Sequence, residues 1–266
     1  MKLLLLFLLL FNASFVFAEP APWSLVVHKD LQKKSPKNFA ERNHVLFKHF
    51  IENSLHSEGE QDFSKVIKQV KNTIFWTGNH GKNIYIDAFQ RSYPSIRLIK
   101  QQDNIPEIVF LIPYIESLWR SKSGKPSADY GYWQLVPAIV KEIQALDTTP
   151  KKIKTARLNK IRSSFRLSTQ VALIHLRRYY FYFAKVAQHT ESDAWLFSIL
   201  AYNWGSGNVK RMLAEMQTQN IEVNFSNFYH YLHEKYQNNP SDKSMKAALE
   251  YLPRLWNISL VIRQNT

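Results

Sequence analysis

The amino-acid sequence predicts a mainly α-helical protein, and three observations support this prediction. Glycine is scarce, with 7 residues in a chain of 266. Strict alternation of apolar and polar residues, which is typical of half-buried strands, is rare, whereas apolar residues recur at helical spacing. The chain contains no cysteine, so a core without disulfide bonds must hold the fold together, and this length is ample for such a core.

The first residues have the pattern of a secretory signal peptide. Lys2 precedes a short apolar run, and small residues follow up to Ala18. Because the run is too short for a comfortable membrane span, we expect cleavage after Ala18, no stable membrane span in the mature chain, and a periplasmic or secreted protein. An uncleaved anchor is the alternative, but the absence of a cysteine after the run excludes a lipoprotein anchor there.

After the signal peptide at residues 1–18, the chain divides into two predicted parts. Residues 19–84 are polar, amphipathic and compatible with helices, and residues 79–83 have the composition of a turn. We expect residues 19–84 to form an N-terminal helical extension that packs on a main domain at residues 85–266. A loosely attached separate module is the alternative interpretation.

The apolar run at residues 105–119 is expected to form one buried helix. Pro106 suits its first turn, where a missing N–H costs little, whereas Pro113 is expected to kink the helix or to interrupt one backbone hydrogen bond. Glu116 stands at the polar end of the run, followed by Ser117. Since burial penalises a carboxylate anion, we expect a raised pKa for Glu116, which suits a general acid.

The middle of the chain is expected to contain a basic loop and a further helix. Residues 148–154 carry several lysines around a proline and are expected to form a loop between helices. The next helix is expected to begin at Ser168 as its N-cap and to continue through residues 177–183.

Two more helices are expected in the last third of the chain. Asp193 is expected to cap a helix that runs through Tyr202 and ends before Gly205. Residues 246–262 are expected to form a last helix, interrupted or kinked at Pro253.

The chain is strongly basic. Its formal net charge is +14, and removal of residues 1–18 deletes one lysine and no acid, which leaves a net charge of +13. Such a charge favours an anionic partner, and for an exported protein a cell wall or membrane surface suits better than nucleic acid, which we do not expect as a partner. The histidines show no metal-ligand spacing, so we expect neither a metal nor a cofactor.

Four short motifs follow one another along the chain. They are Glu116-Ser117, Gly131-Tyr-Trp-Gln-Leu-Val-Pro137, Ala201-Tyr-Asn-Trp-Gly-Ser-Gly207 and Tyr251-Leu-Pro-Arg254. In this order they resemble the motifs of the lytic transglycosylases, a family with the goose-type lysozyme fold, and most of all those of its membrane-bound D-type members. The resemblance covers roughly residues 85–262. One such motif is a weak signal, but four in order are a strong one.

The resemblance implies a lysozyme-like helical catalytic domain, with an activity that cuts the MurNAc-GlcNAc β-1,4 bond of peptidoglycan glycan strands. It implies that Glu116 protonates the glycosidic oxygen and then acts as a base toward the C6 hydroxyl of MurNAc, which gives a 1,6-anhydro end. One carboxylate suffices where the substrate's N-acetyl group stabilises C1. A salt bridge with Arg120 is the alternative role of Glu116. We expect a monomer.

The resemblance also implies residues that bind the substrate. Gln134 offers a donor and an acceptor for a sugar hydroxyl or acetamide. Tyr202 is implied to bind the sugar next to the scissile bond, and Asn203 either binds there or fixes the turn. Ser117 either forms a hydrogen bond near the acid or bonds backbone. Trp133 is expected in the core.

Two further positions follow from the motifs. Tyr251 is implied to be a phenol near Glu116 that orients or tunes the acid, with a simply packed tyrosine as the alternative. Lys125 stands where the family has a leading serine, so Ser127 is a candidate substrate contact and Ser123 is a nearby second candidate for that hydroxyl.

The chain departs from the family pattern around the expected cleft. Arg120-Ser121 replaces the usual Asn-Pro, Ala128-Asp129 replaces Gly-Ala, and the segment Asp-x-Arg-x-Asp keeps only Arg162. The cleft is therefore expected to be remodelled and more basic, and the lysines and arginines at residues 151–162 are expected to help hold an anionic wall.

Two alternative functions follow from these departures. Asp129 could hold a water and turn the enzyme into a muramidase, although a loop aspartate more often bonds local backbone N–H groups. The altered loop also leaves open a catalytically weak peptidoglycan-binding protein.

Overall fold

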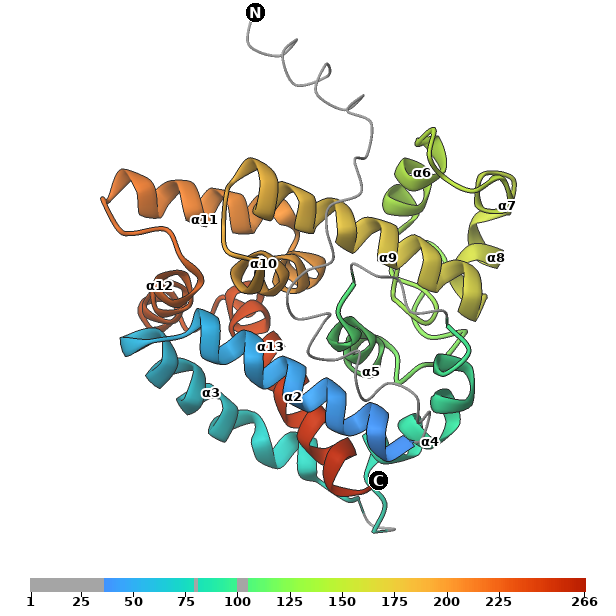
Figure 1. Cartoon of the computed structure of the whole chain (residues 1–266), viewed down its shortest axis with the longest axis horizontal. Helices are drawn as coiled ribbons and strands as arrows, with labels where there is room; N and C mark the ends of the chain where they lie inside the picture. Colours follow the sequence, from blue (N-terminus) through green and yellow to red (C-terminus); the bar gives the residue numbers. More distant parts are fainter. Residues whose placement is uncertain (1–35, 79–80, 100–104) are drawn as a thin grey trace, which may run out of the picture.

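The computed structural model describes residues 36–78, 81–99 and 105–266 (Figure 1). The expected signal peptide, the first part of the expected extension and part of the turn at residues 79–83 lie outside the described residues. Within them the fold is built from helices, and β-pairing is limited to isolated bridges between Gly124, Tyr130 and Leu135. The mainly α fold class predicted from the sequence is therefore confirmed.

The helices occupy most of the described chain. In chain order they are α2 Pro36–Ser54, α3 Ser57–Phe75, α4 Ile84–Ile96, the 3₁₀ helix η2 Glu107–Leu111, α5 Ile112–Glu116, α6 Pro137–Ala145, α7 Lys151–Lys154, α8 Leu158–Ser163, α9 Phe165–Phe181, the π-helical turn η3 Tyr182–Val186, α10 Glu191–Trp204, α11 Ser206–Thr218, α12 Phe225–Asn238 and α13 Lys243–Gln264. Among the described residues, no helix combines the length and the apolar character needed to cross a membrane.

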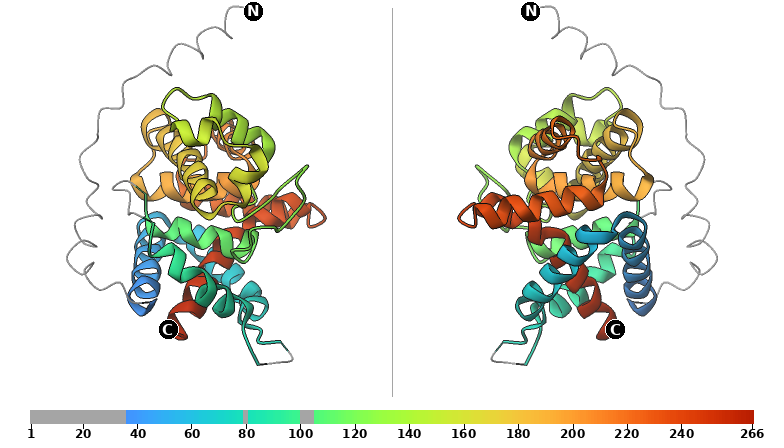
Figure 2. Two further views of the ribbon diagram at one scale, coloured as in Figure 1. Left: turned by 90° about the vertical axis from the view of Figure 1, so that its right-hand side faces the viewer. Right: turned by 90° about the vertical axis from the view of Figure 1, so that its left-hand side faces the viewer.

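The last helix, α13, joins the first described helices to the rest of the molecule. It packs against α2, α3, α4, α5 and α10, and Figure 2 shows α2, α3 and much of α13 at one end, with α6 to α9 at the other. Two buried polar contacts fix this packing, because Asn257 donates to the Ile67 carbonyl at 2.9 Å and the His44 ring lies 3.0 Å from the Ser259 hydroxyl. The boundary between residues 84 and 85 stays a prediction.

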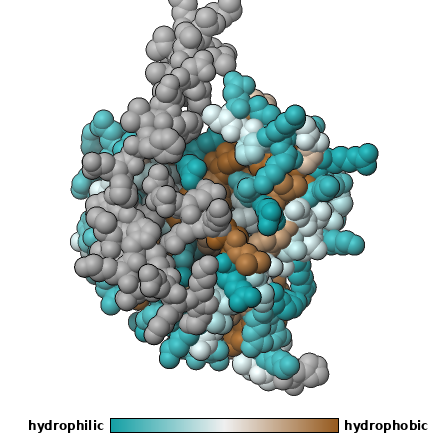
Figure 3. Space-filling view, turned by 45° about the vertical axis from the view of Figure 1, so that its right-hand side comes forward, coloured by the Kyte–Doolittle hydropathy of each residue, from teal (hydrophilic) through white to brown (hydrophobic). Residues whose placement is uncertain are grey.

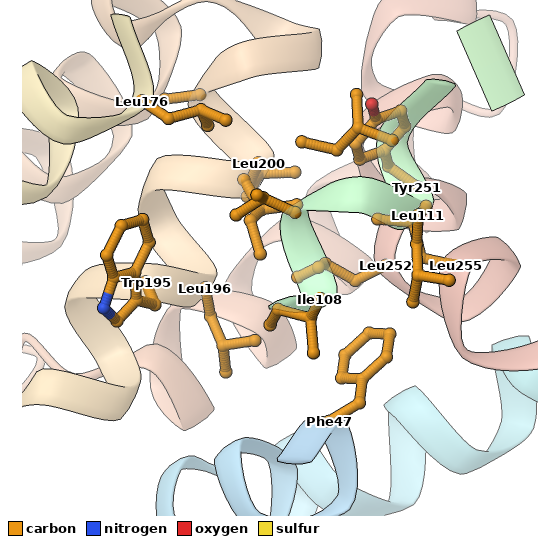
Figure 4. Close-up of a cluster of buried hydrophobic side chains, with 14 of the residues drawn as sticks. Phe47, Ile108, Leu111, Leu176, Trp195, Leu196, Leu200, Tyr251, Leu252 and Leu255 are labelled. Carbon is orange, nitrogen blue, oxygen red and sulfur yellow. The ribbon is translucent and has the colours of Figure 1, made fainter. Parts of the chain in front are cut away.

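The core is centred on α10, whose residues 194–201 are all buried. A helix that is apolar all round must be surrounded by other elements, and Figure 4 shows side chains of α2, η2, α9 and α13 that meet those of α10. Because α10 is held on every side, its C-terminal end, which carries Tyr202, has a fixed position. The predicted end of this helix before Gly205 is confirmed.

The prediction of one helix over residues 105–119 is wrong. The run forms η2 and then the short helix α5, which ends at Glu116. Pro113 lies in the first turn of α5, where its missing N–H removes no helical hydrogen bond, so it starts a helix here and kinks none. After Glu116 the chain turns sharply, with positive φ angles at Leu118 and Trp119.

The two predicted N-caps are also wrong, in each case because the helix begins earlier. Ser164 caps α9, while Ser168 lies inside the helix and donates to the Ser164 carbonyl at 2.7 Å. Thr190 caps α10, and the buried carboxylate of Asp193 instead accepts a hydrogen bond from the Phe225 N–H at 3.1 Å.

Two further predictions need correction. Residues 148–154 are not wholly a loop, since Lys151–Lys154 forms a helical turn whose end is bound by the Gln144 side chain. The last helix is longer than predicted, because Asp242 caps it, and it continues through Pro253 without a break.

Candidate active site

Glu116 lies at the C-terminal end of α5 and is half-buried. Burial raises the pKa of its carboxyl to about 7; the hydrogen bond from Tyr251 opposes this rise, and the negative charge of Asp129 adds to it. A carboxyl with this pKa is about half protonated at neutral pH, so it can both give and take a proton there. The raised pKa predicted from the sequence is confirmed.

Tyr251 approaches Glu116 from α13. Its side chain is 2% exposed, and its hydroxyl donates to Glu116 Oε1 at 2.7 Å. Burial and the nearby Glu116 raise the pKa of Tyr251 well above its usual value, so the phenol keeps its proton and remains a donor. Arg120 is exposed and forms no ion pair with Glu116 within the described chain, so the alternative salt bridge is absent there.

The contact between Tyr251 and Glu116 leads to a prediction about the acid itself. In a Tyr251→Phe variant the pKa of Glu116 should rise further, because the lost hydrogen bond stabilises the carboxylate. A titration of the carboxyl carbon signal by NMR measures this directly. Tyr236→Phe, at a tyrosine of α12 with no contact to Glu116, is the control. A Glu116 pKa that is unchanged or lower in Tyr251→Phe would contradict the prediction.

Ser117 connects the end of α5 to the motif at residues 131–137. Its hydroxyl donates to the Tyr132 carbonyl at 2.6 Å and accepts from the Arg120 N–H at 3.2 Å. The side chain is 6% exposed. Of the two alternatives weighed from the sequence, the structure has the hydroxyl bonded to backbone, and this holds the turn after Glu116 in place.

Gln134 also bonds its own loop. Its backbone φ is +47°, and its side-chain amide donates to the carbonyls of Gly131 at 2.7 Å and Ser123 at 3.1 Å. Because both amide protons are engaged, the side-chain oxygen, which lies close to Gly124, is the group left to accept a hydrogen bond.

The side chain of Arg162 binds the loop that contains Gln134. Its side chain is fully buried, and it donates to the backbone carbonyls of Pro126, Ala128 and Leu135. Gly131 packs so closely on the Arg162 backbone that an added Cβ would lie 1.9 Å from its carbonyl oxygen. The sequence marked Arg162 only as a retained family residue, and nothing in it showed that the partners would be carbonyls.

The neighbouring residues Tyr202 and Asn203 differ in their surroundings. Tyr202 lies near Glu116, and Asn203 does not fix the turn that follows. The Tyr202 hydroxyl donates to the Trp133 carbonyl at 2.6 Å, and burial and the Glu116 charge raise the pKa of Tyr202 well above its usual value. Asn203 is exposed, and Asn208 instead bonds the Trp204 carbonyl at 2.6 Å. Trp133 is fully buried, so its predicted place in the core is confirmed.

The loop at residues 124–130 is exposed and contains Ser127 and Asp129. Within the described residues no hydrogen bond joins Ser127 to Glu116, whose side-chain partner is Tyr251. The Asp129 side chain forms no hydrogen bond with the described residues, so the expected bonding to local N–H groups is not seen, yet its charge acts on the pKa of Glu116. No group of three or more metal-ligating side chains is present in the described part of the chain.

The site thus brings together one half-buried carboxyl, one buried phenol, one partly buried phenol and an exposed loop. Glu116, Tyr202 and Tyr251 come from three helices, α5, α10 and α13. Ser117 and Gln134 support the backbone around them. Such an arrangement can transfer a proton to and from an oxygen of a bound ligand.

Comparison with known proteins finds one family model that matches the part of the chain around this site. Residues 94–225 match a family model described as the transglycosylase SLT domain. No curated protein matches the chain. The matched range includes Glu116, Gln134 and Tyr202 but ends before Tyr251, and the closer resemblance to D-type members stays a prediction. This part of the chain is therefore similar to SLT transglycosylase domains, which have a lysozyme-like helical fold.

Proposed function

We propose that this protein is a peptidoglycan lytic transglycosylase that cleaves the MurNAc-GlcNAc β-1,4 bond and leaves 1,6-anhydro-MurNAc ends. SLT domains act on peptidoglycan. The observation that carries the finer proposal is the Glu116 carboxyl, with its pKa raised to about 7 by burial and its Oε1 bound by the Tyr251 hydroxyl.

Glu116 acts twice in the proposed reaction. In its protonated form it gives the proton to the glycosidic oxygen as the bond from C1 to that oxygen breaks, and GlcNAc leaves as an alcohol. The substrate's N-acetyl group stabilises C1 meanwhile. The Glu116 carboxylate then takes the proton of the C6 hydroxyl, whose oxygen attacks C1 and closes the anhydro ring. A pKa near 7 suits both steps, because neither protonation state is strongly disfavoured at neutral pH.

The surrounding side chains have separate proposed roles. Tyr251 orients the Glu116 carboxyl, and Tyr202 lines the position of the sugar next to the scissile bond. The side-chain oxygen of Gln134 and the exposed Asn203 and Ser127 accept or donate hydrogen bonds to sugar hydroxyl or acetamide groups. Ser117 supports this geometry through the Tyr132 carbonyl.

The proposed setting follows from the substrate. Peptidoglycan lies outside the cytoplasm, so residues 1–18 serve as a signal peptide and the protein acts in the periplasm or after secretion. Residues 19–84 are an extension of the catalytic domain at residues 85–266, and the protein works as a monomer without a cofactor.

A muramidase activity on the same bond is the second candidate. It is favoured by Asp129, whose exposed carboxylate forms no hydrogen bond within the described chain and lies near enough to raise the pKa of Glu116. A water held by this carboxylate would attack C1 in place of the C6 hydroxyl, and the product would then have a reducing end.

Mass spectrometry of digested sacculi tests both candidates. The wild-type chain from Glu19 onward is expected to release anhydro-muropeptides, and Glu116→Gln is expected to release none. Glu222→Gln, the same substitution outside the site, should behave as wild type. Reducing-end products would assign the muramidase, and sacculi that are bound but not cut would leave a binding protein; either result would contradict the leading proposal.

A further inference from the structure

A pocket of about 490 Å³ opens beside the turn that follows Glu116. One wall comes from α4 and includes Arg91 and Ser95, and another comes from residues 119–123. Tyr132 and Phe165 complete the lining. The volume is in the range of sites that bind small organic groups.

The charge of this pocket is entirely positive. Arg91, Arg120 and Lys122 line it, and no aspartate or glutamate does. None of the three forms an ion pair with a described residue, and the one hydrogen bond of the Arg91 guanidinium there is a long contact of 3.5 Å to the Leu118 carbonyl. By contrast, Arg42 outside the pocket forms an ion pair with Glu107 at 3.1 Å. Three unopposed cations around a hollow favour an anionic ligand.

The rest of the lining indicates what kind of anion fits. Trp119, Tyr132 and Phe165 present ring surfaces, with Trp119 and Phe165 at a centroid distance of 5.2 Å. Ser95 and Ser121 add hydroxyl groups. Figure 3, which brings the side with α4 and α6 to α9 forward, shows apolar residues at the centre of this face with hydrophilic ones around them. A ligand with both carboxylates and aliphatic carbon matches such a surface better than a bare inorganic ion does.

Two residues that line the pocket are connected to the segment of the candidate acid. Trp119 follows Glu116 by three residues, and the Tyr132 carbonyl accepts the hydrogen bond of Ser117. We infer that a polymer held at Glu116 extends its side branches toward the pocket. In peptidoglycan these branches are short peptide stems, which combine aliphatic side chains with free carboxylates.

We propose that this pocket binds a carboxylate of the peptide stem on the glycan strand and so makes the protein selective for stems with free acid groups. The inference rests on the proposed function, since it takes peptidoglycan as the polymer held at Glu116. Two of the residues that build the pocket, Arg120 and Ser121, belong to the departure from the family pattern. Arg120, one of the three pocket cations, therefore stands where the family pattern has another residue.

Calorimetric titration of the full chain carrying Glu116→Gln, which should not cut its ligand, tests the proposal. The probes are a disaccharide-tetrapeptide with free stem carboxylates and the same compound with amidated stems. We expect about tenfold tighter binding of the acid form, from three partly exposed charges of modest effect each. The added substitutions Arg91→Gln, Arg120→Gln and Lys122→Gln should abolish this preference.

A matched triple variant controls for net charge. Lys65, Lys68 and Lys71 are exposed residues of α3 that do not line the pocket, and their replacement by glutamine should leave the preference intact. Equal affinity for both probes, or a preference that survives loss of the three pocket cations, would overturn the proposal. Tighter binding of inorganic phosphate than of the acid stem, if lost in the pocket variant, would assign a phosphate polymer and overturn it as well.

The proposed function is tested separately with wild-type protein and glycan strands stripped of stems. Equal cutting of stripped and acid-stem strands would leave the function standing and remove the stem selectivity. If neither strand is cut but the acid stem is still bound, the proposed function is contradicted, whereas the proposed ligand of the pocket is not.

Discussion

At pH 8 the Glu116→Gln variant is expected to have a free energy of unfolding roughly 3 kcal/mol larger than that of the wild-type protein. The pKa of Glu116 is raised from 4.5 to about 7 in the folded chain. Folding therefore disfavours the anion, and each unit of such a shift corresponds to about 1.4 kcal/mol. Glutamine keeps the shape and an oxygen for the Tyr251 hydroxyl, but it carries no charge.

The pH dependence of this effect has a definite sign. Between pH 4.5 and pH 7 the folded protein binds more protons at Glu116 than the unfolded chain, so wild-type stability falls as the pH rises through this window. Below the window Glu116 is protonated in both states and the difference between the two proteins vanishes.

Urea unfolding at pH 5 and pH 8 measures the difference. We expect less than about 1 kcal/mol at pH 5 and the full effect at pH 8. Glu222→Gln should show no comparable change with pH. A Glu116→Gln effect of the same size at both values would mean that the carboxyl is not disfavoured as an anion, and would remove the main support for an acid that works at neutral pH.

Gly131→Ala is expected to lower the free energy of unfolding by more than about 4 kcal/mol. The residue has a φ of +83°, which side chains with a Cβ rarely adopt, and the new Cβ would lie 1.9 Å from the Arg162 carbonyl oxygen. That oxygen belongs to backbone and cannot rotate away. The loop with Gln134 would have to move off the fully buried Arg162.

Gly205→Ala separates the two causes. Gly205 has nearly the same φ, +82°, but an added Cβ would meet nothing within 4 Å. Only backbone strain remains there, which costs of the order of 1–3 kcal/mol. Equal destabilisation of the two variants in thermal or urea unfolding would contradict this prediction. It would show that the loop moves away from the Arg162 carbonyl at little cost in free energy.

The fold could be predicted from the sequence where local patterns decide it. The apolar run of α10 and its end before Gly205 follow from spacing and from glycine chemistry. The prediction of one helix over residues 105–119 is wrong because apolar character indicates only that residues are buried. It does not indicate whether they form one α-helix or a 3₁₀ helix followed by a short α-helix. Ser168 and Asp193 are residue types that often cap helices. The actual caps, Ser164 of α9 and Thr190 of α10, are of equally suitable types and stand earlier in the chain.

The candidate site was predictable in its residue types and less so in its contacts. The order of the motifs pointed to Glu116 and to a phenol near it, and Tyr251 does reach that carboxyl. The engagement of Ser117 and Gln134 with carbonyls of their own loop could not be read from the sequence, because backbone acceptors have no sequence signature. The pocket cations Arg91 and Arg120 line the same pocket because α4 lies beside the turn at residues 119–123, and the sequence does not show that the two are neighbours.

The pairing of Glu116 with Tyr251 spans 135 positions of the chain. Contacts of such long range form late in folding, because a large loop must close before they contribute. In the unfolded chain this carboxyl is exposed to water and has a pKa near 4.5, so it is ionised at neutral pH. The proton donor that the proposed reaction needs is therefore a property of the folded protein and not of the chain alone.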